Sequence, residues 1–564
     1  SASVAIGYQA GLANQTGSKN VFVGYQTGIT ATDIDNSTLV GYLAGTSINH
    51  NNADGTTAIG YKALAALTSG ARNIALGYQV LEDMTTGVDN VMIGYNTGLD
   101  ANHADFSYNV GVGNYVFDGA GAVGAGYNTA MGYAAMSGTL TADADYNTAI
   151  GHSALNGLTS GDNNVALGSG AGGALTTGHR NVLIGKQVGD AITDEDDVVL
   201  IGYNAGIALT HTNSNGSVAI GSGALATLES GRGNIAIGYQ ALDAEDDGDY
   251  NTAVGYQALT AQTGTSGTVG NTAVGYQAGD AITTGQRNTI MGAFALANST
   301  DCDSVVAIGQ SAMENGVATQ DGTIAIGRNA LLTLSSGASN TVVGFDGAKL
   351  ITTGSYNVVM GYASLDAADG GESNNISIGT NAMGSINHDD SDHNVVIGDS
   401  ALLGGTGTVT KNIAIGSNAM GTGVANNDQT GTVAIGYDAL KVLSTGTANV
   451  AVGYEAGDAI STGSANVCIG TNAGGNFDAE DGNVAIGRSA FSGAVNGAAY
   501  CVSIGMTSMQ GAATQDGTIA IGYNALNALT TGGNNTAVGY TALAVNTTGA
   551  NNTAIGYATL GGSQ

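Results

Sequence analysis

Proline and tryptophan are absent from this chain of 564 residues, and aromatic side chains make up only 5% of it. Charged residues account for 10%, whereas glycine alone occurs 93 times. This composition differs strongly from that of an ordinary globular enzyme. The lack of proline is consistent with a backbone in which nearly every amide N–H is needed as a hydrogen-bond donor in a β-ladder.

Positive charge is also scarce. The chain contains 12 Lys plus Arg against 44 Asp plus Glu, which gives a net charge of -32. Such a surface repels phosphate groups, so we expect neither nucleic acid nor an anionic membrane surface as a partner. No apolar run reaches the roughly 18 residues that a membrane span requires, and we expect no membrane insertion by this segment.

The sequence shows no set of residues with a recognisable catalytic pattern. The 7 histidines occupy unrelated positions. Glycine-rich stretches such as 168–173 are expected from the glycine content alone, and they lack the strand-to-helix context that phosphate binding needs. We therefore predict no catalytic residues, no bound cofactor and no enzymatic activity.

What the sequence does contain is a five-residue motif that ends in glycine. Its usual form is Asn/Ser/Thr, then Val/Ile/Thr, a small or apolar residue, Ile/Val/Leu/Met, and Gly. It occurs in 32 copies, from residues 3–7 to 552–556, and successive motif glycines are most often 17 residues apart and never closer. A fixed period of this size indicates stacked repeats that bury their apolar faces against one another. We predict an all-β fold, a parallel β-solenoid (β-roll) of about 17 residues per coil, which forms one continuous array over residues 1–564.

Positions within a repeat are numbered here from the motif glycine. Positions −3 and −1 are aliphatic or Thr in every copy, and alternate residues of a strand point to the same side, so we expect these two to form the core stripe. The usually small residue at −2 is expected to face a second sheet or a partner chain. Only one other, weaker apolar segment follows the glycine, which favours a narrow two-layer coil over a three-sided one.

Two further positions predict columns of like side chains. Asn is the commonest residue at −4, as in Asn164 and Asn251. In a stack these amides are expected to form a buried hydrogen-bond ladder. Tyr is the commonest residue at +1, as in Tyr256, where we expect a stacked column on an exposed rim.

The chain has three cysteines, Cys302, Cys468 and Cys501. In stacked coils Cys468 and Cys501 lie two strand spacings apart, roughly 9.6 Å. This exceeds the separation of about 7 Å between Cα atoms that a disulfide tolerates. The sequence therefore predicts three thiols without disulfide bonds.

Acidic side chains cluster in three inserts. Carboxylates are hard oxygen donors that suit calcium, and in the first two inserts, the second of which starts at Glu245, the calcium candidates are Asp194, Glu195, Asp196, Asp197, Asp246, Asp247 and Asp249. The third insert, residues 388–393, has the same acidic character and carries His388 and His393, which are candidates for a transition metal. The alternative is that all three loops are solvated and keep the chains from sticking laterally.

The motif resembles the repeats of a known group of proteins. Residues 217–221 read SVAIG and residues 251–259 read NTAVGYQAL, which is similar to the head repeats of YadA-like trimeric autotransporter adhesins. Residues 535–543, NTAVGYTAL, are similar to repeats of bacteriophage tail fibres. The resemblance implies a left-handed β-roll, three chains side by side and a role in attachment. The repeat is longer than the usual adhesin head repeat, and no neck, stalk, anchor or chaperone pattern occurs in this sequence.

These observations favour a non-enzymatic structural attachment fibre, an adhesin head or a phage tail fibre that presents receptor-binding loops on a rigid rod. Its expected partners are copies of itself, as a homotrimer or homopolymer, and a cell-surface receptor or glycan. The expected location is extracellular, on a cell or virion surface. One alternative is a self-assembling extracellular filament or matrix protein. The other is an ice-binding solenoid, which is disfavoured because Thr at −3 is expected to be buried.

Overall fold

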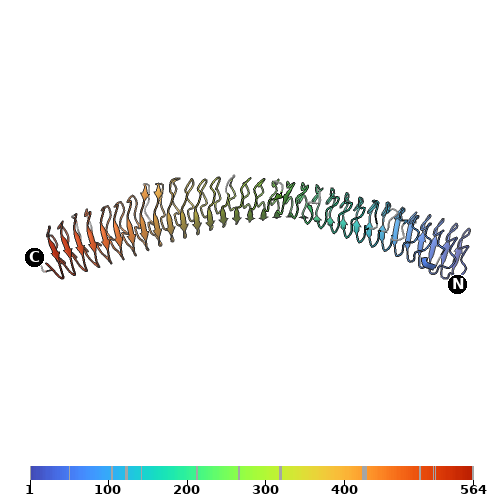
Figure 1. Ribbon diagram of the computed structural model, residues 1–564, viewed down its shortest axis with the longest axis horizontal. Helices are drawn as coiled ribbons and strands as arrows, with labels where there is room; N and C mark the ends of the chain where they lie inside the picture. The colour runs from blue at the N-terminus through green and yellow to red at the C-terminus, as the bar shows by residue number, and fades with distance from the viewer. Residues whose placement is uncertain are drawn as a thin grey trace. The chain divides into compact units, whose positions relative to one another are not determined.

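The computed structural model describes residues 2–49, 51–102, 106–120, 125–141, 143–210, 214–263, 267–316, 321–421, 428–493, 497–511, 514 and 516–561. The chain forms two compact units, Ser1–Gly285 and Gln286–Gln564. Each unit is a parallel β-solenoid, and together they contain about 31 turns of about 17 residues, with almost no helix (Figure 1). The prediction of an all-β parallel solenoid with this repeat length is confirmed.

One main strand per coil lies over positions −3 to −1 of the motif. In the first unit the main strands are β1 Val4–Ile6, β2 Val21–Val23, β3 Thr38–Val40, β4 Thr57–Ile59, β5 Ile74–Tyr78, β6 Val91–Tyr95, β7 Val110–Val112, β8 Thr129–Met131, β9 Thr148–Ile150, β10 Val165–Leu167, β11 Val182–Ile184, β12 Val199–Ile201, β13 Val218–Ile220, β14 Ile235–Ile237, β16 Thr252–Val254 and β18 Thr272–Val274. Two shorter strands, β15 Gly248–Asp249 and β17 Gly267–Thr268, pair with each other, and one short 3-10 helix, η1, spans Asn51–Ala53.

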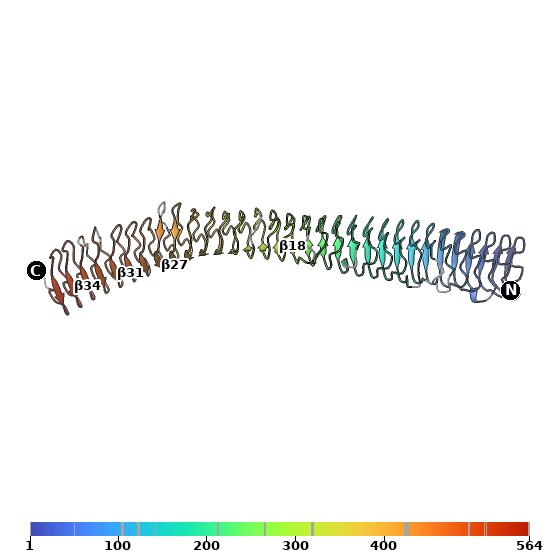
Figure 2. The same cartoon turned by 45° about the horizontal axis from the view of Figure 1, so that its top comes forward.

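The second unit repeats this arrangement. Its main strands are β19 Thr289–Met291, β20 Val306–Ile308, β21 Ile324–Ile326, β22 Thr341–Val343, β23 Val358–Met360, β24 Ile376–Ile378, β25 Val395–Ile397, β27 Ile413–Ile415, β29 Val433–Ile435, β30 Val450–Val452, β31 Val467–Ile469, β32 Val484–Ile486, β33 Val502–Ile504, β34 Ile519–Ile521, β35 Thr536–Val538 and β36 Thr553–Ile555. The short strands β26 Val409–Thr410 and β28 Gln429–Thr430 form a separate pair. Figure 2 shows β27, β31 and β34 following one another along this unit.

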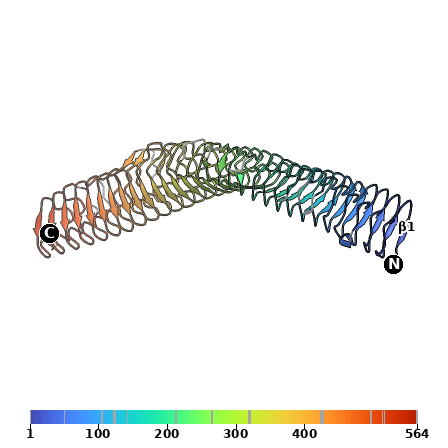
Figure 3. The same ribbon diagram turned by 45° about the vertical axis from the view of Figure 1, so that its right-hand side comes forward.

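Within each unit, successive main strands pair in parallel and in register. Between β9 and β10, for example, Thr148 lies opposite Val165 and Ala149 opposite Ala166. The same motif positions face each other in the other described pairs, so equivalent side chains form columns. Figure 3 shows the strands of successive coils following one another within each unit. The β-branched residues at −3 favour the extended backbone that this pairing requires.

The direction of the strand side chains differs from the prediction. In every strand after β1 the central residue, at −2, is fully or almost fully buried, whereas −3 and −1 are half-buried or exposed. The expectation that −3 and −1 form the core stripe is therefore wrong. The interior of a coil of about 17 residues is narrow, so it accepts the small side chain at −2, usually Ala, and the larger aliphatic residues point outward.

The return segment of each coil is a series of tight turns rather than a second strand. Three positions per coil, −5, +2 and +4, commonly adopt positive φ even when they are not glycine, as in Arg180 (58°), Gln187 (53°) and Leu155 (50°). Left-handed backbone is unfavourable for such residues. The backbone N–H groups of these three residues donate to carbonyls of an adjacent coil at 2.9–3.0 Å, so the stacking hydrogen bonds offset the cost of this conformation.

The motif glycine is required by close stacking. Gly94 has a φ of 150°, and a Cβ atom placed on it would lie 2.1 Å from the carbonyl oxygen of Gly113 in the next coil. The motif glycines before Gly556 meet the next glycine in the same way where their surroundings are described. No L-residue combines this backbone angle with this approach, which explains why glycine ends every motif.

Inside the coils, the side-chain volumes at positions −2 and +4 compensate each other. Where −2 is large, +4 is often glycine, and where −2 is Ala, +4 is often Leu. A Cβ atom on Gly28 would lie 2.7 Å from the ring of Phe22, which is buried, whereas the next Ala-bearing repeats, such as that of Ala58, place Leu64 in the core. Interiors of proteins are close-packed, so the two positions must be substituted together.

We predict that Phe22 and Gly28 are energetically coupled. Phe22→Ala is expected to lower the free energy of unfolding by about 3–5 kcal/mol because it leaves a cavity, and Gly28→Leu is expected to be destabilising because the new side chain meets the ring. In the double variant the leucine occupies part of the space that the ring leaves. The double variant should therefore lose less unfolding free energy than the two single variants together, by about 1–3 kcal/mol. Urea unfolding followed by circular dichroism measures all three. Additive costs would contradict the proposed packing.

Candidate functional site

The outward face of the main strands is a regular apolar surface. We call it the strand face, and it consists of the side chains at −3, −1 and +1 of successive coils. At β10, Val165 is 38% exposed and Leu167 is 44% exposed, and at β23, Met360 is 48% exposed. Columns of exposed aliphatic side chains of this regularity are unusual on a soluble monomer and are typical of an interaction surface.

Tyr side chains at +1 form one edge of the strand face. Tyr61 and Tyr78 stack with ring centroids 4.9 Å apart, and Tyr239 and Tyr256 stack at 5.1 Å. These rings are 38% to 45% exposed. The prediction of a stacked Tyr column on an exposed rim is confirmed, and the rings supply an amphipathic border where an apolar face meets water.

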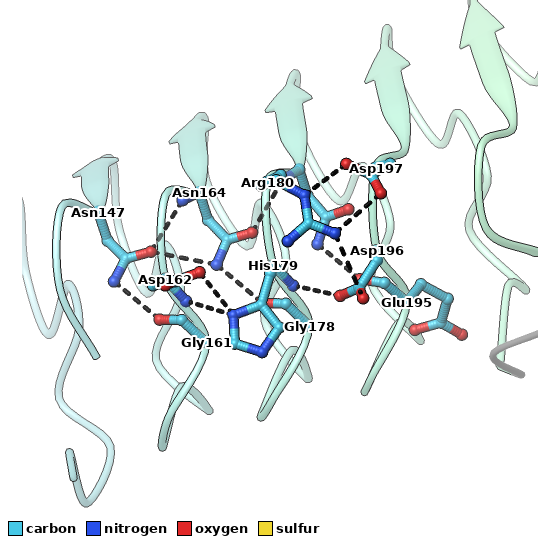
Figure 4. A network of polar contacts seen from close by, with 11 residues as sticks. Asn147, Gly161, Asp162, Asn164, Gly178, His179, Arg180, Glu195, Asp196 and Asp197 are labelled. Carbon is cyan, nitrogen blue, oxygen red and sulfur yellow. Dashed lines mark hydrogen bonds and ion pairs between the residues drawn. The ribbon is translucent and has the colours of Figure 1, made fainter. Parts of the chain in front are cut away.

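The predicted Asn ladder lies inside the coils and is confirmed (Figure 4). The backbone N–H of Asn164 donates to Oδ1 of Asn147 in the preceding coil at 2.9 Å, and Nδ2 of Asn164 donates to the carbonyl of Gly178 in the next coil at 2.9 Å. Asn181 in turn donates its backbone N–H to Oδ1 of Asn164 at 3.0 Å. Each buried amide therefore joins three coils, which is a structural task and leaves little capacity for a ligand.

A second ladder, at position −6, was not anticipated from the sequence. The backbone N–H of His179 donates to Oδ1 of Asp196 at 2.7 Å, and that of Asp162 donates to Nδ1 of His179 at 3.1 Å (Figure 4). Ser18 donates its backbone N–H to Oδ1 of Asp35 at 2.6 Å, and this bond lowers the pKa of the Asp35 carboxyl. Position −6 holds Asp, Ser, Asn or His in different coils, so no single residue type marks this ladder in the sequence. It can be recognised only by counting six residues back from each motif glycine.

The first group of calcium candidates is split, because Asp196 and Asp197 contact Arg180 whereas Glu195 points into the coil. Arg180 binds Asp197 through Nε at 2.6 Å and approaches Asp196 at 3.6 Å, and the bond to Arg180 lowers the pKa of the Asp197 carboxyl. Glu195 points inward, is fully buried, and accepts the backbone N–H groups of Thr193 and Asp194. Burial raises the pKa of Glu195. Within the ranges given above, these four acidic residues do not form a cluster of metal-ligating atoms.

The second group lies closer together. Ligand atoms of Glu245, Asp246 and Asp247 lie within 4.8 Å of one another. Glu245 is buried, its two oxygens accept bonds from the backbone N–H of Gly248 (2.8 Å) and from the side chain of Asn251 (3.1 Å), and burial raises its pKa to about 7.

Asp249 is not part of that cluster. It accepts the backbone N–H of Arg232 at 2.9 Å, and its carboxylate lies 3.7 Å from the Arg232 guanidinium. The carboxylate of this candidate therefore already has a cationic partner.

In the third insert, the two histidines lie outside the groups of metal-ligating side chains found among the described residues. Nδ1 of His388 accepts the backbone N–H of Asp390 at 3.2 Å, and His393 has a left-handed backbone with a φ of 60°. Among the residues with described positions, neither histidine belongs to a group of three metal-ligating side chains. Asp389 does belong to one, together with Asp369 and Glu372 of the preceding coil.

The three cysteines are reduced and buried, which confirms the prediction of thiols without disulfides. Cys468 lies in β31 and Cys501 immediately before β33, and both strands pair with β32, so the two residues are separated by one intervening strand. Burial raises the pKa of Cys302 and of Cys468 to about 12, and it also raises that of Cys501.

The sequence matches no protein-family model, and a search of curated proteins finds no match. Across the described residues, no helix has the length and apolar character that crossing a membrane would require.

We predict that the Asn ladder contributes strongly to stability. Asn164→Leu removes an acceptor from the buried N–H of Asn181 and a donor from the carbonyl of Gly178, and each unsatisfied group costs about 1–3 kcal/mol. Asn164→Ser is the matched control, because Ser37 at the same position accepts the backbone N–H of Thr56 at 3.3 Å. Chemical unfolding should show a larger loss for Leu than for Ser, and equal losses would show that the ladder is dispensable.

We further predict that the cysteines do not react in the folded protein. At pH 8 a thiol whose pKa is about 12, as for Cys302 and Cys468, is almost entirely protonated and is also shielded from reagents. Iodoacetamide should therefore label no cysteine under native conditions and three per chain in denaturant, as counted by intact-mass spectrometry. Rapid native labelling of any of them would mean that the coils open locally at that point.

Proposed function

We propose that this protein is a non-enzymatic structural attachment fibre, of the kind formed by adhesin heads and phage tail fibres. It acts outside the cell, on a cell or virion surface, and presents receptor-binding loops that recognise a surface receptor or glycan. The observation that carries this proposal is the strand face, a regular apolar surface on a chain whose buried Asn column is already bonded from coil to coil. The similarity of the motif to adhesin and tail-fibre repeats supports the same function.

In this proposal the coils are left-handed, and three copies of the chain lie side by side with their strand faces toward a common axis. Residues such as Val165, Leu167 and Met360 then lose their contact with water, which is favourable at roughly 25 cal/mol per Å² of apolar surface. The acidic turns remain outside and keep the assemblies apart through a net charge of -32 per chain. This charge also disfavours nucleic acid as a partner.

One observation favours a second candidate, an ice-binding surface. The sequence predicts that Thr at −3 is buried, but Thr272 and Thr289 are exposed on the strand face. These threonines alternate irregularly with Val and Ile at the same position, and aliphatic residues at −1 and Tyr at +1 accompany them. Self-association of the face explains this apolar mixture better than ice binding does. Thermal hysteresis of the purified protein, at any oligomeric state, would instead support the ice-binding candidate.

We predict that a charge on the strand face prevents association. Met360→Asp places a carboxylate in the proposed contact, where burial of an unpaired charge is costly, and it should weaken association by at least about 100-fold. Analytical ultracentrifugation measures the change, with a trimer expected for the unchanged protein. Leu350→Asp is the matched control, since Leu350 is 40% exposed but lies outside the strand. A monomeric unchanged protein, or equal effects of both substitutions, would contradict the proposal.

Attachment itself is tested with beads coated with the purified full chain. We expect the beads to adhere to at least one cell type in a panel of bacterial and animal cells, and soluble protein should compete. Adhesion to none of them, together with continuous filaments in electron micrographs of dilute protein, would favour the self-assembling matrix protein instead.

A further inference from the structure

Three carboxylates from two successive coils meet beside β24. Asp369 and Glu372 lie in the turn that precedes β24, and Asp389 lies in the turn that precedes β25. One ligand oxygen from each lies within 4.8 Å of the others. Asp369 and Asp389 are exposed, whereas Glu372 is fully buried, so the group has an inner carboxylate and two outer ones.

The inner carboxylate lacks a partner for one of its oxygens. Oε2 of Glu372 accepts the backbone N–H of Gly370 at 3.2 Å, but Oε1 is buried and has no hydrogen-bond partner. Burial raises the pKa of Glu372, and the charges of Asp389 and Asp369 raise it further. No cation of the described chain forms an ion pair with these three residues. A buried acceptor without a partner is costly, and two neighbouring negative charges increase that cost.

The repeat provides two internal comparisons. Glu195 and Glu480 occupy the same position as Glu372, seven residues before the next motif glycine, and each accepts a backbone N–H from its own turn in the same way. Oε1 of Glu480 also accepts the backbone N–H of Gly497 at 3.0 Å, so both of its oxygens are bonded. Glu195 leaves Oε1 unbonded but has no cluster of carboxylates around it.

The approach of Asp389 depends on glycine. A Cβ atom on Gly370 would overlap the carboxylate of Asp389, so only glycine at 370 allows Asp389 to lie directly over the turn that carries Glu372. The lengthened turn 369–372 and the insert at 388–393 therefore bring like charges together.

We propose that Asp369, Glu372 and Asp389 form a binding site for a calcium ion. The ion supplies the missing partner of Glu372 Oε1, neutralises the mutual repulsion, and links two adjacent coils through their turns. Oxygen donors in irregular turns suit Ca²⁺, which accepts six to eight ligands with flexible geometry, better than Mg²⁺, which demands near-octahedral geometry and dehydrates reluctantly. Water completes the coordination at the exposed side.

Isothermal titration of the calcium-free full chain with CaCl₂ at 150 mM NaCl tests the site. We expect one saturable site per chain with a dissociation constant on the order of 10⁻⁴ M, as in extracellular calcium modules. Asp389→Asn and Glu372→Gln should each weaken it by at least about tenfold, whereas MgCl₂ should bind more weakly than CaCl₂.

The matched control is Glu480→Gln, which removes the same charge from the equivalent position of another coil and should leave calcium affinity unchanged. Asp389 is exposed, so Asp389→Asn remains informative if Glu372→Gln fails to fold, as judged by circular dichroism. The proposal is overturned by the absence of saturable binding, by equal losses in Glu480→Gln and Asp389→Asn, or by tighter binding of Mg²⁺ than of Ca²⁺.

Discussion

In-register pairing of identical motif positions is the constraint on which the remaining structure depends. Because each strand lies over an equivalent strand, every strand residue lies next to the residue at the same motif position in the neighbouring coil of its unit. A column of glycine then permits close backbone contact, a column of Ala fills a narrow interior, and a column of Asn satisfies buried polar groups from coil to coil. Each motif position has nearly the same surroundings in every coil, so the same residue types fit it repeatedly along the chain.

The same constraint separates the surfaces of the molecule. Aliphatic and Tyr side chains accumulate on the strand face because the small −2 residues occupy the interior. Charged residues concentrate in the turns, where carboxylates at −6 accept backbone N–H groups from the preceding coil. The chain thus carries an apolar face suited to association and acidic turns that remain in water, and both the proposed assembly and the proposed calcium site follow from this division.

The spacing of the motif was sufficient to predict the strand in each coil, the Asn and Tyr columns and the unbridged thiols. It was not sufficient to predict which side of the strand faces inward, because Ala at −2 and Ile at −1 are both apolar and only the width of the coil decides between them. The −6 ladder was missed since side chains as different as Asp35 and His179 act there through the same backbone geometry. The cluster of Glu372 with Asp389 joins residues of different coils, and no pattern within one insert indicates it.

Distances between spin labels test the central claim of in-register stacking most directly. The labels are attached to cysteines introduced at position −1 in the first unit, either at Leu167 and Ile237 or at Leu167 and Leu76. The three native cysteines are replaced by Ala in these variants. The labelled protein is diluted with unlabelled protein. Four and five coils separate these pairs, so pulsed electron resonance should give mean distances of about 19 and 24 Å at 4.8 Å per coil. Distances that do not grow by one strand spacing per coil would contradict the stacked solenoid.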